Sequence, residues 1–155
     1  MRLVDTYSAA NGLGFLSSQG QLAVIKKSIE SAPPVLTRGS GPAIKAHIED
    51  SLANHGWAAN VRIDVQRAVT INAFHHSGIA LQVQVGNIAR AFYDLLKLES
   101  VVRLQKVEVG VLVVPTRDAS RLLGDNLSNF ERLSGEHRDL FNSIVSMPLV
   151  ILGFE

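Results

Sequence analysis

Two glutamines, Gln82 and Gln84, lie in a run whose alternating pattern places both of them on one face of a β-strand. The opposite face of this strand is apolar and is formed by Ile79, Leu81, Val83 and Val85. Gly86 and Asn87 then lead into an amphipathic helix whose free N–H groups point back toward the two amides. Polar side chains beside the N-terminus of a helix form a geometry at which anions and metal ions are bound.

A site that cleaves phosphodiesters commonly holds a divalent cation between carboxylates, because the hard cation prefers oxygen ligands. Gln82 and Gln84 supply only neutral carbonyl oxygens, and Ala73, just before the strand, supplies no ligand. We therefore expect poor affinity for Mg²⁺ at this position and assign no metal ligands. The competing interpretation is that the two glutamines only form hydrogen bonds with neighbouring loops.

Two residues of the first helical turn, Asn87 and Arg90, could receive a phosphate group. An equally good interpretation makes Asn87 a simple helix cap and Arg90 a surface residue. Further basic residues could form a surface for a DNA backbone, each contributing salt-dependent affinity: Arg62, Arg67, Arg38 and Lys45. Charges scattered in this way are more often simply solvated.

The remaining candidates for chemistry are weaker. His75 and His76 are adjacent, so in a strand they point to opposite faces, and a solvated hairpin turn is the favoured interpretation. Asp5, Asp64 and Glu108 are the acids near predicted strands, and no motif places them at a site. The sequence contains no Ser-His-Asp order, Walker loop or dinucleotide-binding glycine fingerprint.

Composition limits the classes of protein to consider. With 155 residues, we expect one domain over residues 1–155. The 15 basic and 14 acidic residues nearly balance, so DNA binding would need a local patch. The absence of cysteine excludes disulfides and thiolate zinc sites and is compatible with a reducing compartment. No apolar run is long enough to span a membrane, and we expect a cytoplasmic protein.

Periodicity predicts an α/β fold with a mixed central sheet of about four to six strands flanked by helices. Strands are expected at 61–71, 79–87, 106–115 and 149–153, with residues 72–78 connecting the first two as a hairpin. Helices are expected at 19–31, 42–54, 87–102 and 116–123. The strand, helix and buried strand over 79–115 form a βαβ unit with parallel strands. The apolar composition, 46% of residues, also suits a subunit interface.

Several stretches of the sequence resemble the restriction endonucleases of the BglII and BstYI group, within the PD-(D/E)XK nuclease superfamily, and they occur in the same order along the chain. They are the N-terminal Met1–Ser8 with Asn11-Gly12-Leu13, the strand and Tyr-Asp-Leu helix of Ile79–Leu98, the run Val107–Pro115 and the closing Pro148–Gly153. The resemblance implies a restriction-endonuclease-like core, a homodimer around duplex DNA, and Mg²⁺-dependent cleavage of short palindromic sites.

Carried over residue by residue, the resemblance implies a site that lacks its acids. The first metal-binding Asp of the family falls at or next to Ala73, its Glu falls on Gln82, and its Gln falls on Gln84. Only the last of these is retained. The polar neighbours of the missing Asp are Asn72, His75 and His76, and none of them is anionic. The chain is also shorter than these enzymes around the loop at 38–41.

The sequence therefore predicts a DNA-binding protein that resembles a nuclease but is impaired or inactive in hydrolysis. One alternative is an active endonuclease with divergent ligands, such as Asp64 or Glu108 acting with Gln82 and Gln84, which would require Mg²⁺. Another alternative is a structural or regulatory dimer with no role on DNA. The sequence does not distinguish a natural loss of the acids from their removal by engineering.

Overall fold

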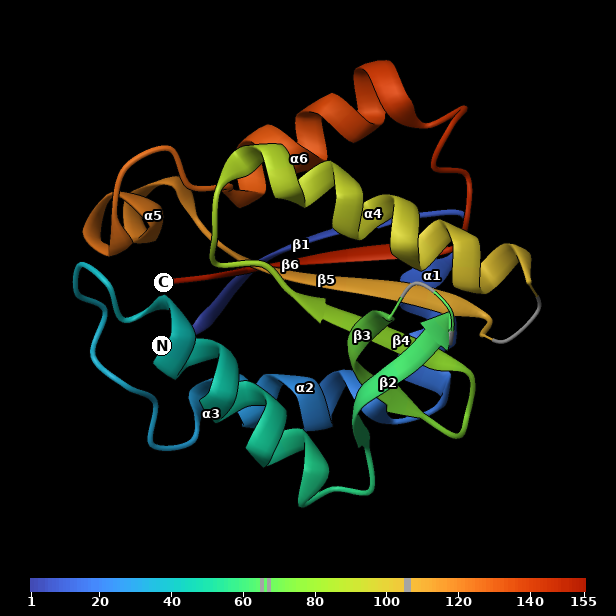
Figure 1. The fold of residues 1–155 in the computed structure, drawn as a ribbon, viewed down its shortest axis with the longest axis horizontal. Coiled ribbons are helices and arrows are strands. Elements are labelled where there is room, and N and C mark those ends of the chain that lie inside the picture. Colours follow the sequence, from blue (N-terminus) through green and yellow to red (C-terminus); the bar gives the residue numbers. More distant parts are fainter. Residues whose placement is uncertain (65, 67, 105–106) are drawn as a thin grey trace.

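A six-stranded sheet with the order β1-β6-β5-β4-β3-β2 forms the centre of the computed structural model (Figure 1). The structure describes residues 1–64, 66, 68–104 and 107–155. The strands are β1 (Leu3–Ala9), β2 (Ala58–Asp64), β3 (Val69–His75), β4 (Ile79–Val83), β5 (Val109–Pro115) and β6 (Leu149–Phe154). β4, β5 and β6 run parallel, whereas β1 pairs antiparallel with β6, and β2, β3 and β4 pair antiparallel in turn. The predicted mixed sheet and its parallel βαβ unit are confirmed.

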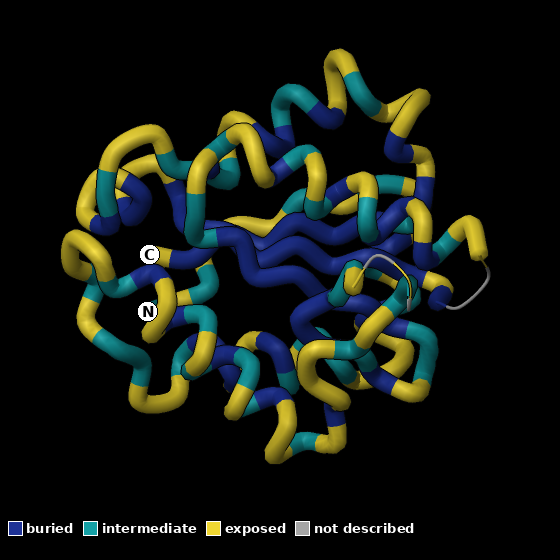
Figure 2. Tube along the Cα trace, viewed as in Figure 1, coloured by how far each residue is buried: buried dark blue, intermediate teal, exposed yellow. Residues whose placement is uncertain are grey.

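Helices cover both faces of this sheet. On one face lie α1 (Gly12–Ser18), α2 (Gln21–Glu30) and α3 (Gly41–Ala53), which we call the α3-side layer (Figure 1). On the other face, the α4-side layer, lie α4 (Ile88–Arg103), α6 (Phe130–Glu136) and a π-helix (His137–Phe141). α5 (Arg117–Leu123) lies at the end of the sheet toward which β5 runs. The central strands are buried throughout and the helices only on one side (Figure 2).

The helix pattern follows from apolar spacing and end signals. In α3, Ile44, Ile48 and Leu52 repeat every four residues and are fully buried against the sheet. The helix ends before Gly56, whose φ of 85° is the left-handed conformation that glycine adopts readily, and Trp57 then packs into the core. Within the described ranges, none of the helices is both long and apolar enough to cross a membrane.

The hairpin before β4 differs from the prediction. The expected strand over 61–71 is divided between β2 and β3, and most of the expected connection over 72–78 is the second half of β3. Alternation on both sides of the break concealed it, and Ala68 in the turn has a φ of 53° although its residue type gives no turn signal. The actual turn into β4 lies at His76–Gly78, with Gly78 at a φ of 86°.

Candidate functional site

Five polar side chains meet between the end of β4 and α4, and we call them the amide cluster: Asn72, Gln82, Gln84, Asp94 and Lys97. The alternation of β4 sends Leu81 and Val83 into the α3-side core, so Gln82 and Gln84 face the α4-side layer. Both glutamines are buried, with 1% and 5% of their surface exposed. Buried amides require hydrogen-bond partners, and the cluster supplies them.

Asp94 is the centre of the cluster. Gln84 Nε2 donates to its Oδ2 at 2.8 Å, and Gln82 Nε2 donates to its Oδ1 at 3.4 Å. Lys97 Nζ lies 2.7 Å from the same Oδ1. One carboxylate therefore accepts hydrogen bonds from two amides and forms an ion pair with one ammonium group, so its negative charge is balanced inside the cluster.

The amide oxygens are turned toward the backbone. Gln82 Oε1 accepts from the N–H of Asn72 at 3.1 Å, and Gln84 Oε1 accepts from the N–H of Gly86 at 2.7 Å. Asn72 Oδ1 accepts from the N–H of Val83 at 2.8 Å. The regular pairing of β3 with β4 ends at Ala73 and Leu81. Beyond that point, these side-chain bonds satisfy the backbone N–H groups. The oxygens that could serve as metal ligands are thus already used as acceptors.

Lys97 is held by two adjacent elements. Besides Asp94, its Nζ contacts the carbonyl oxygen of Thr70 on β3 at 3.2 Å. The ring of Tyr93 lies 5.4 Å from Nζ, within the range of a cation–π contact. The side chains of Lys97 and Asp94 are each 15% exposed. Such a lysine is fixed in place by its partners instead of extending into solvent.

The structure places Asn72, and not Ala73, beside Gln82. Ala73 packs into the α3-side core on the opposite face of the sheet, where it is 1% exposed. The side chain of Asn72 faces the cluster. Asn72, next to Ala73, is therefore the residue of β3 whose backbone and side chain contact the end of β4 at Gln82 and Val83.

The candidate phosphate contacts lie in different settings. Asn87 Oδ1 accepts from the N–H of Ala89 at 2.8 Å, so its side chain caps α4. Arg90 is exposed in the first turn of α4, where its guanidinium makes no hydrogen bond or ion pair with any described residue. Arg62 is exposed on the edge strand β2. Arg67 lies outside the described residues.

The other sequence candidates lie away from the amide cluster or serve the fold. Glu108 contacts the turn at Gly78, at the opposite end of β4 from Gln82. His75 is buried beside Trp57, with 5.3 Å between the ring centroids, whereas His76 is exposed. Burial lowers the pKa of His75, and the neighbouring His76 lowers it further. Among the residues described, no three His, Cys, Asp or Glu side chains come together as a metal-binding group.

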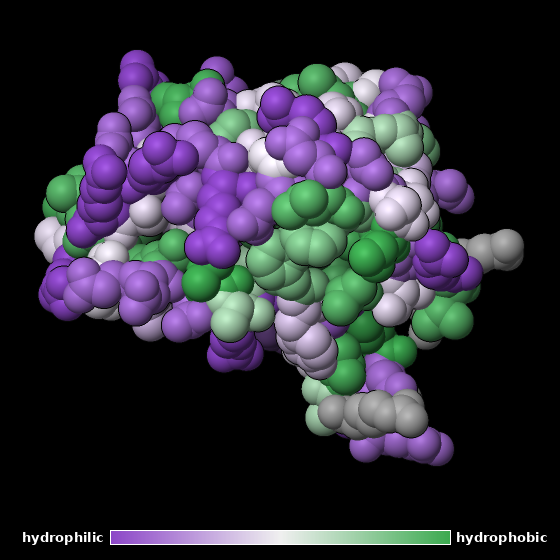
Figure 3. Space-filling model, turned by 90° about the horizontal axis from the view of Figure 1, so that it is seen from above, coloured by the Kyte–Doolittle hydropathy of each residue, from purple (hydrophilic) through white to green (hydrophobic). Residues whose placement is uncertain are grey.

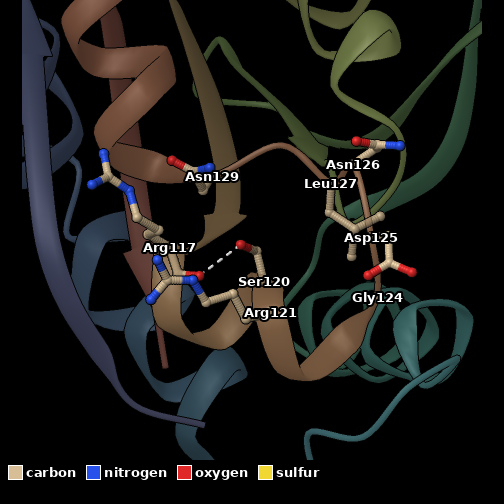
Figure 4. A pocket seen from close by; sticks show the side chains of 8 residues that line it. All are labelled: Arg117, Ser120, Arg121, Gly124, Asp125, Asn126, Leu127 and Asn129. Carbon is tan, nitrogen blue, oxygen red and sulfur yellow. Dashed lines mark hydrogen bonds between the residues drawn. The ribbon is translucent and has the colours of Figure 1, made fainter.

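A hollow of about 460 Å³ lies between α5 and the start of α6 (Figure 4). It is lined by Arg117, Ser120, Arg121, Gly124, Asp125, Asn126, Leu127 and Asn129. Its rim is joined to the start of α4, because Ile88 N–H donates to the carbonyl of Asn126 at 3.0 Å. The Arg117 side chain makes no ion pair with a described residue, while Asp125 is paired with Arg38 at 2.8 Å. The hollow is a basic feature of the surface, whereas the buried amides and the Asp94–Lys97 ion pair belong to the amide cluster.

Asp94 and Lys97 are the site residues that sequence reasoning did not select. A signal exists, because Asp94 falls within the buried stripe of α4 formed by Ala91, Leu95 and Leu98. A charged residue on an apolar stripe requires a buried partner. Periodicity shows the charge, but it does not show that the partners come from β4.

Comparisons with known proteins agree with this architecture. The model of a family described as BamHI, restriction endonuclease BamHI, matches residues 9–154. A crystal structure of restriction endonuclease BglII complexed with a DNA 16-mer is similar, with a TM-score of 0.84 and 13% identity over 100% of this chain and 78% of that chain. A crystal structure of free BglII gives 0.72 and 14%, over 100% and 80%. No curated protein matches the sequence. The restriction-endonuclease-like fold predicted from the sequence is confirmed.

Proposed function

The chain belongs to the family of restriction endonuclease BamHI, and we propose that it is a DNA-binding member whose amide cluster is impaired or inactive in phosphodiester hydrolysis. The observation that carries the proposal is the set of partners around Asp94. Gln82 and Gln84 donate hydrogen bonds to this carboxylate, and Lys97 forms an ion pair with it. We infer that residues 1–155 form one domain of the restriction-endonuclease type. We also infer that the protein works in the cytoplasm.

The residues present do not fit a magnesium ion. Mg²⁺ is usually bound through carboxylates and water in near-octahedral geometry and gives up water reluctantly. The cluster has one carboxylate, Asp94, and an ammonium group already lies 2.7 Å from it. The carbonyl oxygens of Gln82 and Gln84 accept backbone N–H groups. No step of hydrolysis through a metal ion can be derived from this arrangement.

DNA binding is supported by the exposed cationic groups near the cluster. Arg90 lies in the first turn of α4, and Arg117 lines the hollow joined to that turn. Neither guanidinium is paired with a described carboxylate, so both are available to phosphates. Asn87 adds little through its side chain, because that side chain caps the helix.

Gel shifts with duplex DNA at increasing salt test the binding. We expect affinity to fall linearly with the logarithm of salt concentration, and Arg90→Ala to reduce the slope by about 1. Lys26→Ala, on the exposed side of α2 in the other layer, is the matched control and should leave the slope unchanged. Absence of binding at low salt would favour the structural or regulatory dimer.

Plasmid cleavage with Mg²⁺ and Mn²⁺ tests the impairment. We expect no cutting above background by the natural sequence. Asn72→Asp combined with Gln82→Glu restores carboxylates on the face of the cluster, whereas Ala73→Asp with Gln82→Glu places one in the α3-side core. A gain of cleavage in the first pair alone would support the assignment of Asn72. Robust cutting by the natural sequence that is lost on Gln84→Ala would contradict the proposal.

The alternative of an active endonuclease with divergent ligands is favoured by one observation, the presence of Asp94 in the cluster. Asp94, and neither of the acids named from the sequence for this alternative, bonds to Gln82 and Gln84. Glu108 lies at the other end of β4, and Asp64 lines a hollow together with Lys97. In this alternative the natural protein cuts DNA with Mg²⁺, and Asp94→Asn abolishes cutting without abolishing DNA binding. The same plasmid assay therefore separates the two functions.

We further propose that the protein pairs with a second copy through the outer face of α4 and the π-helix. Figure 3 shows apolar side chains gathered on this side of the molecule, next to a strongly polar region. Phe92 and Phe141 join the two elements, with 5.0 Å between their ring centroids. Around them, four large side chains are 47–65% exposed: Tyr93, Leu96, Leu140 and Ile144. Exposed apolar surface of this kind marks interaction sites.

Sedimentation at increasing protein concentration tests this pairing. Ile144→Glu should convert a dimer into a monomer. Leu122→Glu on α5 is the matched control, because both side chains are 56% exposed. A natural protein that remains monomeric at high concentration would contradict the proposed interface.

A further inference from the structure

The ammonium group of Lys97 makes the kind of contacts that a bound cation would make. Its Nζ lies 2.7 Å from the Asp94 carboxylate and 3.2 Å from the carbonyl oxygen of Thr70. Both ligands are oxygens, and they come from the two elements that enclose the site, α4 and β3. Nζ is thus held by an anionic and a neutral oxygen.

The charges of the amide cluster sum to zero without a metal ion. Asp94 contributes one negative charge, Lys97 one positive charge, and Asn72, Gln82 and Gln84 none. A divalent ion approaching Asp94 would meet a positive charge that is already there and only 15% exposed to screening water. The cluster therefore repels an added cation even though it contains a carboxylate.

We propose that Lys97 is a built-in replacement for a divalent cation and that it excludes such ions from the amide cluster. The proposal deepens the proposed function and rests on it for the biological role, because it explains how a site of this family would keep its shape without metal. Lys97 is a positioning residue here: it holds Asp94, which in turn holds the two glutamines. DNA binding is then independent of divalent ions.

Access to the site exists. A hollow of about 300 Å³ between the β2–β3 hairpin and α4 is lined by Ile63, Asp64, Val69, Tyr93, Leu96, Lys97, Ser100 and Leu104. In a single copy of the chain, a small ion can reach Lys97 through this hollow, and Asp64 also lines its wall. Exclusion of cations is therefore attributed to the ammonium group and not to a closed entrance.

Terbium luminescence tests the proposal directly. Tyrosine transfers excitation energy to a Tb³⁺ ion bound close to its ring, and the Tyr93 ring lies 5.4 Å from Lys97 Nζ. Lys97→Met keeps an unbranched side chain of similar size and removes the charge. We expect this variant to gain saturable, Tyr93-dependent emission with an affinity at least about tenfold higher than that of the natural protein. Mn²⁺ should displace the terbium.

Four variants serve as controls. Lys97→Arg keeps the positive charge and should still exclude Tb³⁺, and Lys97→Met combined with Asp94→Asn should lose the binding again. Adding Tyr93→Phe to Lys97→Met should remove the emission while Mn²⁺ binding, measured by electron paramagnetic resonance, remains. Lys45→Met, on the α3 pair with Glu49, should gain no Tyr93-dependent emission. Circular dichroism confirms folding, and Lys97→Gln replaces Lys97→Met if the latter does not fold.

Two results would overturn the proposal. One is natural protein that binds Tb³⁺ or Mn²⁺ as tightly as the Lys97→Met variant, with the binding abolished by Asp94→Asn. The other is a folded Lys97→Met or Lys97→Gln variant that gains no cation binding. Gel shifts in the presence of a chelator measure DNA binding separately from cation exclusion. Loss of DNA binding with cation exclusion intact would refute the proposed function alone.

Discussion

Among the described residues, each of the two helical layers contains one lysine–carboxylate pair, and the two pairs are built differently. On α4, Asp94 lies 2.7 Å from Lys97 and also accepts from two glutamines. On α3, Glu49 lies 3.8 Å from Lys45, too far for a hydrogen bond, and its buried Oε1 has no hydrogen-bond partner among the described residues. The α4 pair belongs to a network, whereas the α3 pair is isolated.

The difference shows how a core can tolerate polar groups in two ways. Burial raises the pKa of Glu49; Lys45 partly opposes this effect, and the nearby Asp50 adds to it. An under-paired group of this kind costs stability at neutral pH. A group with several donors, such as Asp94, is costly only when one of its partners is removed.

The largest expected effect is the loss of Asp94. Asp94→Ala leaves two buried amides and one ammonium group without their acceptor, and we expect the free energy of unfolding to fall by about 3 kcal/mol. Urea denaturation followed by circular dichroism measures it. Glu49→Ala is the counterpart on α3, and we expect it to cost less than about 1 kcal/mol. Equal costs for the two variants would show that the layers do not differ in this way.

A smaller effect is expected for the lysines. Lys97→Met leaves the Asp94 carboxylate with its amide donors only, and should cost about 2 kcal/mol when measured in a chelator. Lys45→Met should cost under about 0.5 kcal/mol, because the Lys45 side chain is 39% exposed and its ion pair is long. A larger loss for Lys45→Met would contradict the contrast between the two pairs.

The next prediction concerns His75 on β3, which packs beside Trp57 on the α3 side of the sheet. The pKa of His75 in the folded protein lies below 6.5, the ordinary value that applies to the unfolded chain. At pH values between the folded and the unfolded pKa, the unfolded chain therefore binds more protons than the folded protein. The free energy of unfolding therefore falls as the pH drops below about 6.5. Denaturation at a series of pH values should show a shallower decline for His75→Gln. An identical pH dependence in both proteins would exclude His75 as its source.

The smallest effect is the pH dependence due to Glu49. Its pKa in the folded protein is raised above 4.5, so the folded state binds the proton more tightly, and stability from this group declines as the pH rises from 4.5 through the folded pKa. Glu49→Gln should remove that decline and raise the free energy of unfolding at pH 7 by less than about 1 kcal/mol. A loss of stability at pH 7 would instead show that the charged Glu49 is well paired.

Sequence periodicity located most of the fold but not the edge strand β1 or the hairpin of β2 and β3. The spacing of Ile44, Ile48 and Leu52 predicted α3, and the uninterrupted apolar run of β5 predicted a strand buried on both faces. The break between β2 and β3 was missed because alternation resumes after a turn that includes Ala68. Local residue type gives no signal when the backbone conformation of the turn is imposed by the rest of the sheet.

The sequence by itself indicated that Gln82 and Gln84 point to the same side, because side chains alternate along extended backbone. The strand expected over 79–87 was too long, since β4 ends at Val83 and Gln84 follows it. The sequence also determined that no carboxylate stands at positions 72, 73, 82 or 84. Only the tertiary structure decided that Asn72, instead of Ala73, faces Gln82, since this depends on where the β3–β4 ladder ends. It likewise decided that Asp94 and Lys97 meet the amides. That contact requires α4 to pack across β4, and residue spacing along one element carries no information about the other.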